Sequence, residues 1–409
     1  MAENGAVPAN GLPDGVEEEL RHLSCYTTPP ERTLELFEAA RKGGCPVAHS
    51  EEHEGFHLLL AYEDVKAGMA NHELFSSEPQ VLRPMLPRKP IPALEMDPPR
   101  HQHWRALFNQ AVTARTAAMM EPQVRADINR HIDEFIGNGK AELVAELCEP
   151  VPAEAICHLV GVDEDLVPVV REKAIAMFAA MGEPEEFGRL QAEFGEVTVG
   201  EIHKRKTEPR DDFLTYLASV EVEGRELDDD DYVVLLAAFL GAGHHSTTSA
   251  MASLIYEVFS DEERKAKLIA NPEAIPDAVE EALRLHPPFY GFFRRATEDT
   301  EVEGVEIPEG CDVYMGWAAA NRDPDQFPAP DEFKLDRGRN RHLSFGFGVH
   351  TCPGAPLARM ELRVAIEELL RRVPDLKIEI DEPKYEFGGG DYAFLVELPV
   401  SFAPQAAAG

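Results

Sequence analysis

The sequence predicts a mainly α-helical protein with small β-sheets, in which a helix-rich subdomain is joined to a smaller β-rich subdomain. From His101 to Val220, apolar residues recur at intervals of three and four, the spacing that buries one face of an α-helix. Later in the chain, short alternating segments are separated by Glu303-Gly304 and Pro308-Glu309-Gly310, and glycine turns of this kind are typical of β-hairpins. Hydrophobic residues make up 44% and charged residues 28% of the chain, which is the composition of a folded globular protein.

The chain has 409 residues, which exceeds the usual size of one independent domain. No stretch of linker composition interrupts it, so we expect two subdomains that share a core within one folded unit, residues 21–402. A core of this size can bury a large cofactor. Residues 1–20 and 403–409 have the composition of loose ends.

The first hundred residues predict two helical regions, one strand and one long loop. Residues 17–42 and 61–72 carry helix-forming residues with intermittent apolar positions, and His57-Leu58-Leu59-Leu60 between them indicates a short strand. Seven prolines then fall between Pro79 and Pro99. Because proline breaks helices and lacks a backbone donor, this segment is predicted to be a long ordered loop, and such loops are usually functional.

The middle of the chain predicts a succession of helices. Residues 101–220 are interrupted at Gly137-Asn138-Gly139, Gly161-Val162-Asp163, Gly182-Glu183-Pro184 and Glu208-Pro209. The acidic residues 228–231 then start a long helix that runs through Tyr256. Four acids at a helix N-terminus complement the helix dipole, so capping and solubility explain them.

The last third of the chain mixes helices and strands. Asn271-Pro272 and Ile275-Pro276 open a helix that His286-Pro287-Pro288 ends. Another helix follows Cys352 and runs to about Arg372. Strands are predicted at residues 294–296, 301–307, 312–316, 376–380 and 394–400.

The charge balance argues against two kinds of partner. Lysine and arginine number 39 and aspartate and glutamate 75, so the formal net charge is −36. A field this negative repels nucleic acid and anionic membranes. The longest apolar stretch, residues 233–243, is about half of what a membrane-spanning helix needs, and the N-terminus shows no basic flank followed by an apolar signal core. We therefore expect a cytoplasmic protein without a nucleic-acid or membrane partner.

The six cysteines form no CxxC pair and no dense framework, which is consistent with reduced thiols and gives no support to a zinc site. They are Cys25, Cys45, Cys148, Cys157, Cys311 and Cys352.

Cys352 lies in the most informative segment of the chain, Phe345-Gly346-Phe347-Gly348-Val349-His350-Thr351-Cys352-Pro353-Gly354. The glycines permit tight turns and the close approach of a flat partner. A helix that begins near Pro356 directs its positive end toward the sulfur and favours the thiolate. A thiolate on such a loop suits a ligand of haem iron, whereas the common alternative is a buried structural cysteine.

This loop resembles the proximal haem loop of the cytochrome P450 family, Phe-Gly-x-Gly-x-His-x-Cys-x-Gly, and meets every fixed position of it. The resemblance extends from about Asp97 to the C-terminus. It implies a bacterial-type cytochrome P450 fold with b-type haem, and Cys352 as the ligand of the iron. Glu281 and Arg284 match the family's Glu-x-x-Arg helix, and Arg337 matches the arginine that joins this pair. These three residues are implied to hold the proximal side together.

Four further residues are implied to bind the haem propionates. His101 and Arg105 lie four apart at a helix start, directly after Asp97-Pro98-Pro99, where the family has a His-x-x-x-Arg motif. Arg294 occupies the strand position of another propionate ligand in the family, and His350 in the cysteine loop is similar. Arg295 would replace Arg294 if the strand alternation were shifted by one residue.

Residues 242–248, Ala-Gly-His-His-Ser-Thr-Thr, resemble the distal helix of the family with two departures. His245 stands where an acid is usual, and Ser246 where threonine is usual. A serine hydroxyl can anchor the water chain that delivers protons, and a histidine can relay protons near neutral pH. Thr247 would supply the hydroxyl if the helix carried an extra bulged residue, and a substrate group is another source. Adjacent helical residues point about 100° apart, so no metal site is expected between His244 and His245. A structural role for His245 stays open.

The resemblance implies a monooxygenase that oxidises a small, largely apolar substrate with dioxygen. Electrons would come from a separate ferredoxin and its reductase, and the enzyme would be a monomer. Substrate walls are implied at residues 80–94, 174–181, 235–243 and 288–293, with the apolar side chains Met177, Phe178 and Phe239. Arg83, Arg88 and Lys89 could pair with a substrate carboxylate, but loop cations are generally solvated, so a charged substrate is not expected.

The ferredoxin would dock near Cys352, on a patch formed by Arg105, Arg337, Arg339, Arg341 and Arg359. Two other functions stay open. A haem-thiolate protein could bind or sense a small molecule without oxidising it, or hydrogen peroxide could drive the oxidation. A cysteine-nucleophile hydrolase is disfavoured, since no histidine and acid pattern accompanies Cys352.

Overall fold

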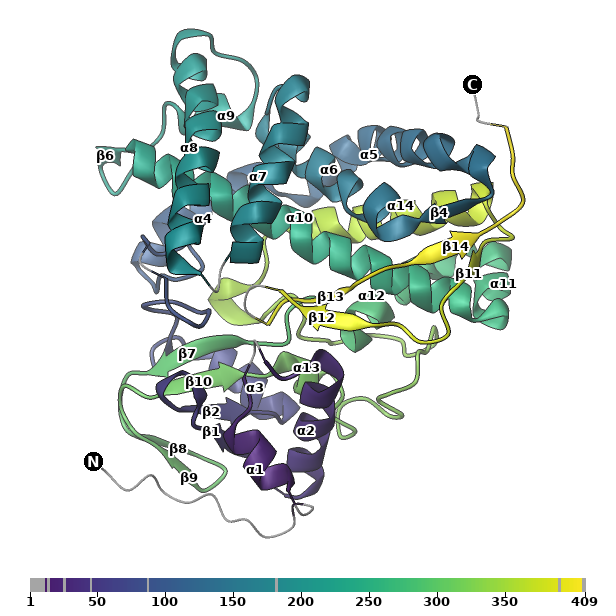
Figure 1. The fold of residues 1–409 in the computed structure, drawn as a ribbon. Coiled ribbons are helices and arrows are strands. Elements are labelled where there is room, and N and C mark those ends of the chain that lie inside the picture. Colours follow the sequence, from purple (N-terminus) through teal and green to yellow (C-terminus); the bar gives the residue numbers. More distant parts are fainter. Residues whose placement is uncertain are drawn as a thin grey trace.

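The computed structural model describes residues 12, 15–24, 27–44, 46–86, 88–180, 183–388 and 391–406, except for the side chain of Phe178. Cys25, Cys45 and Met181 lie outside the described residues, as do residues 1–11, 13, 14 and 407–409 of the predicted loose ends. Figure 1 shows a large helical part above a smaller β-rich part. The prediction of a mainly α fold with small sheets is therefore confirmed.

Helices form most of the described chain. They are α1 (Val16–Arg21), α2 (Pro30–Lys42), α3 (Tyr62–Ala70), α4 (Arg100–Ala111), α5 (Ala114–Phe135), α6 (Pro150–Val160), α7 (Val167–Ala179), α8 (Pro184–Thr207), α9 (Phe213–Leu217), α10 (Asp229–Ser260), α11 (Glu262–Ala270), α12 (Ile275–Leu285), α13 (Trp317–Ala320) and α14 (Ala355–Arg372). One short π-helical turn, Val144–Cys148, precedes α6.

The long helix α10 crosses the middle of the molecule and packs on α6, α8, α12 and α14 (Figure 1). Its start is capped as the acidic run predicts. The Asp228 carboxylate accepts a hydrogen bond from the Asp231 amide at 2.8 Å, and the Asp231 carboxylate accepts one from the Asp228 amide at 3.0 Å. This reciprocal cap satisfies two amides at the helix end. The helix continues to Ser260, beyond the predicted Tyr256, because Val258 and Phe259 also face the core.

The strands are β1 (Val47–Ser50), β2 (Phe56–Leu59), β3 (Phe75–Ser76), β4 (Lys140–Glu142), β5 (Glu221–Val222), β6 (Arg225–Glu226), β7 (Phe292–Ala296), β8 (Thr300–Val302), β9 (Val305–Ile307), β10 (Asp312–Met315), β11 (Lys377–Ile378), β12 (Tyr385–Phe387), β13 (Ala393–Leu395) and β14 (Pro399–Ser401). The largest sheet has the order β1-β2-β10-β7-β3, and a smaller one the order β11-β14-β4. In the larger sheet β10 is parallel to β2 and antiparallel to β7, with Asp312 opposite Arg295 and Val313 opposite Arg294.

The structure differs from the sequence prediction at several places. Residues 17–42 form two helices, because Pro29 adopts an extended conformation and Pro30 can only begin a helix. The helix α1 begins at Val16, inside the segment 1–20, and its buried Leu20 packs in the N-terminal core. Six strands in the described part of the chain were not predicted: β1, β3, β4, β5, β6 and β12. Thr113 divides α4 from α5, since its hydroxyl accepts the Thr116 amide at 3.0 Å and so caps α5.

The proline-rich loop, residues 79–99, contains no helix or strand in its described part, as predicted. The buried carboxylate of Glu95 organises it from inside. This carboxylate accepts hydrogen bonds from the Ile91 amide at 2.7 Å and from the Arg88 guanidinium at 2.6 and 3.0 Å. A buried and fully bonded carboxylate fixes the surrounding backbone, so this loop is an ordered wall.

Candidate active site

The loop that carries Cys352 has a backbone that only its glycines permit. Gly346 and Gly348 have φ angles of 72° and 74°, in the region that side chains disfavour. A Cβ atom at Gly348 would lie 3.0 Å from the carbonyl oxygen of Met69, so this turn also packs closely on α3. The Cys352 amide donates to the Phe345 carbonyl at 2.7 Å and closes the loop. Directly after it, α14 begins at Ala355.

Burial and the neighbouring positive groups shift the pKa of the Cys352 thiol in opposite directions. Burial raises the pKa of the Cys352 thiol. The amide of Gly354, the guanidinium of Arg105 and the amide of Ala355 act in the opposite direction and favour the thiolate. A metal cation bound to the sulfur would favour the thiolate further, because the thiolate is the form of cysteine that ligates metals.

His101 is buried in α4 and has unsatisfied ring nitrogens. It is 3% exposed, and neither nitrogen has a hydrogen-bond partner among the described residues. Its ring lies edge-on to that of His350, with 4.7 Å between centroids. Burial, helped by the neighbouring His350 and Arg105, lowers the pKa of His101 to about 4. The ring is therefore neutral at pH 7 unless an anion binds beside it.

Arg294 and Arg295 point to opposite sides of β7. Arg294 is 5% exposed, and no carboxylate oxygen of the described residues lies within 4.0 Å of it. Its guanidinium donates to the Phe293 carbonyl at 3.2 Å, and burial lowers its pKa to about 10. Arg295 is partly exposed and pairs with Asp312 at 2.8 Å. The alternation therefore presents Arg294, and not Arg295, as the cation that lacks a counter-ion.

Pairing is the rule for the other buried arginines in the described part of the chain. Each of them has a carboxylate within ion-pair distance: Arg83, Arg205, Arg284 and Arg372. A buried charge without a partner is strongly unfavourable. The exception at Arg294 therefore marks a place that an anionic group from outside the chain would complete.

The remaining two members of the predicted propionate set are held by protein groups. The Nδ1 atom of His350 lies 3.0 Å from the Ala93 carbonyl, and its Nε2 atom lies 2.9 Å from the Ser77 hydroxyl and 3.7 Å from Asp97. Arg105 donates to the Thr351 carbonyl at 2.5 Å and ties α4 to the cysteine loop. His350 thus orients the ring of His101, while Arg105 is half-buried and has no carboxylate partner among the described residues.

These features fit the flat dianionic cofactor that the resemblance implies. The ring of His101, without a hydrogen-bond partner, and the guanidinium of Arg294, without a carboxylate, suit two carboxylates from outside the described residues. Sequence reasoning missed Asp97 as the carboxylate beside His350, although it belongs to the Asp97-Pro98-Pro99 motif. It also missed Asp312, which neutralises both Arg83 and Arg295 and could have been found only from the sheet register.

On α10, the residues of the distal motif face different sides. Ala242 is exposed and Ser246 partly exposed in the middle of a long central helix, one turn apart. The Ser246 hydroxyl donates to the Ala242 carbonyl at 2.7 Å. Thr247 is 4% exposed, and α10 is α-helical throughout. The bulge on which the alternative role of Thr247 depends is therefore absent, and Ser246 is the hydroxyl on the open face.

The two histidines beside Ser246 are buried and neutral. The Nδ1 atom of His245 donates to the Gly241 carbonyl at 3.2 Å, and the Nε2 atom of His244 donates to the Glu149 carbonyl at 3.1 Å. Burial lowers the pKa of His245 to about 4, and that of His244 to about 3. No group of three or more metal-binding side chains occurs among the described residues. At pH 7 His245 therefore carries no charge, at the position where the resemblance makes an acid usual.

Glu281, Arg284 and Arg337 form a closed network behind the cysteine loop. The Glu281 carboxylate accepts from Arg284 at 2.8 and 2.9 Å, from Arg337 at 2.6 Å and from Asn340 at 3.0 Å. Arg284 also donates to the carbonyls of Asn321, Pro330 and Glu332. Burial raises the pKa of Glu281, but Arg284 and Arg337 more than compensate and hold it below its usual value.

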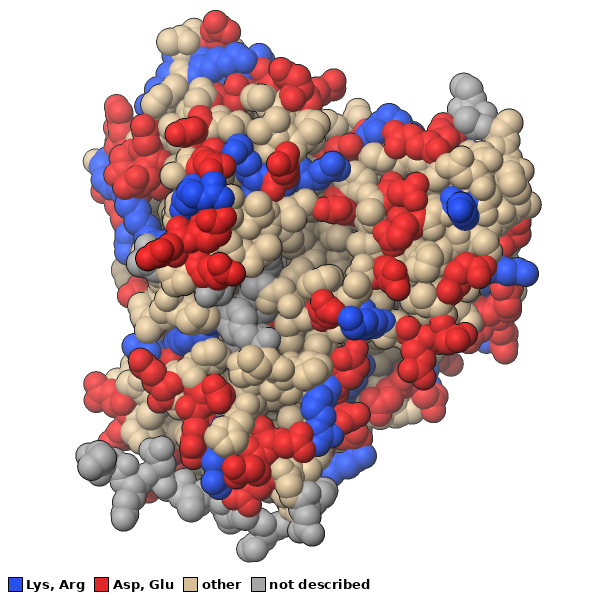
Figure 2. All heavy atoms as spheres, viewed as in Figure 1, with Lys and Arg blue, Asp and Glu red and all other residues tan. Residues whose placement is uncertain are grey.

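Apolar side chains form a cluster between the proline-rich loop, α7 and α8. Its buried members are Val81, Leu82, Leu86, Met177, Ala180, Phe187 and Leu190. Figure 2 shows uncharged atoms lining a hollow between the helical and β-rich parts, on a face where acidic side chains outnumber basic ones. Phe239, which the sequence leaves either as a pocket wall or as a core residue, is buried and stacks on Phe108 with 4.3 Å between centroids.

The three cations of the proline-rich loop are all paired. Arg83 binds Asp312 at 2.5 Å, Arg88 binds Glu95 at 2.6 Å and Lys89 binds Asp228 at 3.0 Å. Solvation was the prediction for these side chains, and it is wrong for Arg83 and Arg88, which are buried with their partners. None of the three is free to neutralise an anionic substrate.

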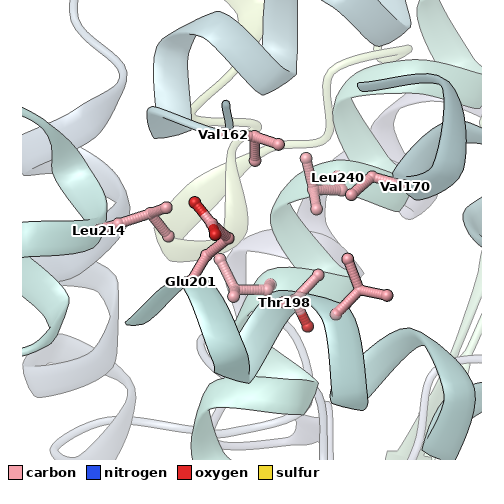
Figure 3. A pocket seen from close by; sticks show the side chains of 8 residues that line it. Val162, Val170, Thr198, Glu201, Leu214 and Leu240 are labelled. Atoms are coloured by element: carbon pink, nitrogen blue, oxygen red, sulfur yellow. The ribbon is translucent and has the colours of Figure 1, made fainter. Parts of the chain in front are cut away.

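A small cavity lies elsewhere, between α7, α8, α9 and α10 (Figure 3). Its volume is about 10 Å³, room for about one water molecule. Its lining is apolar except for Thr198 and Glu201, whose polar atoms are bonded to the Phe194 carbonyl and to Arg205. This cavity is too small for an organic substrate.

No helix in the described part of the chain is both long and apolar enough to cross a membrane.

Comparisons with known sequences and structures all point to one protein family. A family profile described as Cytochrome P450 matches residues 186–384. Mycinamicin IV hydroxylase/epoxidase of Micromonospora griseorubida is 36% identical over 344 residues, which cover 81% of this chain and 86% of that protein.

Two further relatives span nearly the same length. The 6-deoxyerythronolide B hydroxylase of Saccharopolyspora erythraea is 31% identical over 350 residues, 79% of this chain and 84% of that protein. The crystal structure of CYP108D1 from Novosphingobium aromaticivorans superposes with a TM-score of 0.85 at 27% identity and covers 97% of this chain and all of that one.

Proposed function

Since this chain belongs to the cytochrome P450 family, a family of haem monooxygenases, we propose that it oxidises a small, largely apolar organic molecule with dioxygen. The observation that carries this proposal is a loop-held thiol, Cys352, together with two buried side chains. Among the described residues, His101 has no hydrogen-bond partner for its ring nitrogens and Arg294 has no carboxylate partner. The form of the cofactor that we propose is haem b, and its two propionates would complete this donor set.

In this proposal Cys352 is the iron ligand, and His101, Arg105 and Arg294 hold the propionates. When bound, the haem supplies the activation of dioxygen by two electrons. The chain supplies the anionic sulfur, which the amides of Gly354 and Ala355 stabilise, and the buried setting that excludes water.

Ser246 is the residue that we propose for proton delivery. Its hydroxyl lies on the open face of α10 and gives its own proton to the Ala242 carbonyl at 2.7 Å. The oxygen lone pairs therefore remain free to accept a hydrogen bond from a water molecule, and the hydroxyl can pass a proton onward when it turns. His245 is neutral and bonded to Gly241, so its support for a relay is weaker than that of Ser246.

The substrate is proposed to be uncharged and held by apolar contact. Val81, Leu86, Met177 and Phe187 provide such a surface. The neighbouring loop cations are already neutralised by Asp312, Glu95 and Asp228. An anionic substrate would find no free counter-ion on this loop and would lose its hydration without compensation.

A ferredoxin, itself reduced by a ferredoxin reductase, is the proposed electron donor. Of the basic residues near the cysteine loop, Arg337 is bound to Glu281 and Arg359 to Glu280. Arg339 and Arg341 are exposed. Phe347 in the cysteine loop is 40% exposed, and the Lys66 ammonium lies 5.8 Å from its ring centroid. An exposed aromatic ring beside a cation suits an acidic partner. We propose that the enzyme works with this partner as a monomer.

The ferrous carbonyl spectrum tests the cofactor site. Wild-type holoenzyme is expected to give the red-shifted Soret band of thiolate ligation, and Cys352→Ser is expected to abolish it. The buried Cys157, which lies in α6, provides the control, because Cys157→Ser should keep the band. A red-shifted band that persists in Cys352→Ser would contradict the assignment.

The activity test uses ligands found by their shift of the haem spectrum, with NADH, ferredoxin reductase and ferredoxin. Product formation that requires the reductase chain supports the proposal. A spectral shift without product would indicate a binding protein, and product formed with hydrogen peroxide alone would indicate peroxide-driven oxidation.

A further inference from the structure

The C-terminal hairpin, strands β12 and β13, lies along α10 (Figure 1). It is joined to the helix at three residues spaced one turn apart. The Tyr392 hydroxyl donates to the His245 carbonyl at 2.7 Å, the Ser249 hydroxyl donates to the Ala393 carbonyl at 2.6 Å, and the Tyr385 hydroxyl donates to the Ser253 hydroxyl at 3.1 Å. The first of these bonds ends on the peptide group that leads into Ser246.

We propose that Tyr392 is a positioning residue for Ser246, and this inference rests on the proposed role of Ser246 in proton delivery. The carbonyl of His245 and the amide of Ser246 belong to one planar peptide unit. A hydrogen bond to that carbonyl from another part of the chain fixes the plane, and with it the Cα atom from which the Ser246 hydroxyl projects.

Tyr392 is well placed to act as a fixed point. It is 5% exposed, and its ring stacks on Phe394 with 5.6 Å between centroids. Phe289 packs on it at 5.6 Å, and a Cβ atom at Gly388 would lie 2.9 Å from the ring. With close neighbours on several sides, the phenol has little freedom to move.

The other side-chain donors to this turn of α10 cannot act in the same way. His245 donates to the Gly241 carbonyl, Ser246 to the Ala242 carbonyl and Thr248 to the His244 carbonyl. Each of these bonds lies within the helix and moves with it. The His244 ring also ties this turn to another element, through the Glu149 carbonyl, but the Tyr392 bond is the one made to the peptide group that leads into Ser246.

The consequence concerns the fate of dioxygen. If the hydroxyl of Ser246 is well placed, a second pair of electrons and protons follows the first, and two NADH reduce one dioxygen to two waters when no substrate is present. If it is displaced, the reaction stops after one NADH, one proton and one dioxygen have given one hydrogen peroxide. Small displacements have large effects on proton transfer.

The test compares Tyr392→Phe with Tyr385→Phe in haem-loaded enzyme. Both changes keep the ring and remove one phenol hydroxyl that bonds to α10. NADH oxidation, oxygen uptake and hydrogen peroxide are measured with a surrogate ferredoxin and its reductase, in H2O and in D2O. Thermal unfolding of each variant is followed in parallel.

We expect Tyr392→Phe to raise the ratio of peroxide to water by roughly threefold to tenfold, the worth of one hydrogen bond, and to change the solvent isotope effect. Tyr385→Phe should lower the unfolding temperature about as much as Tyr392→Phe does. It should change neither the ratio of peroxide to water nor the solvent isotope effect. An unchanged ratio in Tyr392→Phe, or an equal change in Tyr385→Phe, would overturn the inference.

Ser246→Ala separates this inference from the function on which it rests. If Ser246→Ala raises the peroxide ratio and Tyr392→Phe does not, only the positioning role fails. If Ser246→Ala also leaves the ratio unchanged, the proposed role of Ser246 fails and the positioning role fails with it. A wild-type enzyme without the red-shifted carbonyl band would contradict the proposed function directly.

Discussion

Two regions of this protein bury positive charge in opposite ways. Behind the cysteine loop, the guanidinium groups of Arg284 and Arg337 end on the Glu281 carboxylate and on backbone carbonyls. At β7, Arg294 is as deeply buried but has no carboxylate partner among the described residues, and on α4 the neutral, buried ring of His101 has no hydrogen-bond partner among them. Both regions lie near the same loop, so the contrast separates charge that the chain neutralises itself from charge that awaits a ligand.

The contrast also shows why a motif alone does not define a role. Glu186 and Arg189 have the same spacing as Glu281 and Arg284, and their bonds are also bidentate, at 2.5 and 2.9 Å. This second pair lies on the surface of α8, with side chains about half exposed. Exposed ion pairs stabilise proteins little because water already solvates both charges.

The largest expected effect follows from breaking the closed network. Glu281→Ala leaves Arg284 and Arg337 buried without a carboxylate, and removing one partner of a buried pair costs about 3–5 kcal/mol. We expect the free energy of unfolding to fall by that amount in urea denaturation of the haem-free protein.

Glu186→Ala is the matched control, because it removes the same carboxylate spacing from an exposed pair. Its unfolding curve should coincide with that of the wild type. If the two substitutions shifted the curve equally, burial would not be what distinguishes the two pairs.

The second expected effect is that of Arg294→Met, which, unlike Glu281→Ala, should not lower the free energy of unfolding of the haem-free protein. Arg294→Met replaces a buried cation without a counter-ion by an apolar side chain of similar length, so stability should stay the same or rise. Haem retention should weaken by roughly tenfold to a hundredfold, the value of one charge-assisted hydrogen bond. The rate of haem transfer to an excess of a haem-scavenging protein measures this loss.

Arg295→Met is the neighbouring control on the same strand. It removes the partner of Asp312 and should lower stability while leaving the haem transfer rate unchanged. A faster transfer in Arg295→Met than in Arg294→Met would show that the strand faces the cofactor with its other side.

Local sequence patterns were sufficient for much of this structure. Glycine positions in residues 345–354 predicted the turns, and the acidic run predicted the cap of α10. In each case the signal and the structure involve residues within a few positions of one another, so no knowledge of the tertiary fold was required.

Long-range pairing was what the sequence could not provide. Strand β1 is stabilised by β2, and β2 in turn pairs with β10 more than 250 residues later. The partner of Arg83 is Asp312, from the same distant strand, so an arginine expected to be solvated is buried. The Tyr392 bond to α10 likewise joins residues 147 positions apart, and no local pattern marks it.

The smallest expected effect is on the pH dependence of the free energy of unfolding. Burial lowers the pKa of His101 to about 4, whereas an unfolded histidine titrates near 6.5. Below about pH 6.5 this histidine binds a proton in the unfolded chain but not in the folded haem-free protein. The free energy of unfolding therefore falls as the pH is lowered from about 6.5 toward 4. His101→Phe should flatten this part of the profile, while His103→Phe, on the exposed side of the same helix, should not. His244 and His245 contribute to the profile with the same sign and remain in both variants.

If haem propionates bind at His101, they favour its charged form, so the His101→Phe effect should shrink or reverse in the holoenzyme. An effect of equal size and sign with and without haem would place the propionates elsewhere.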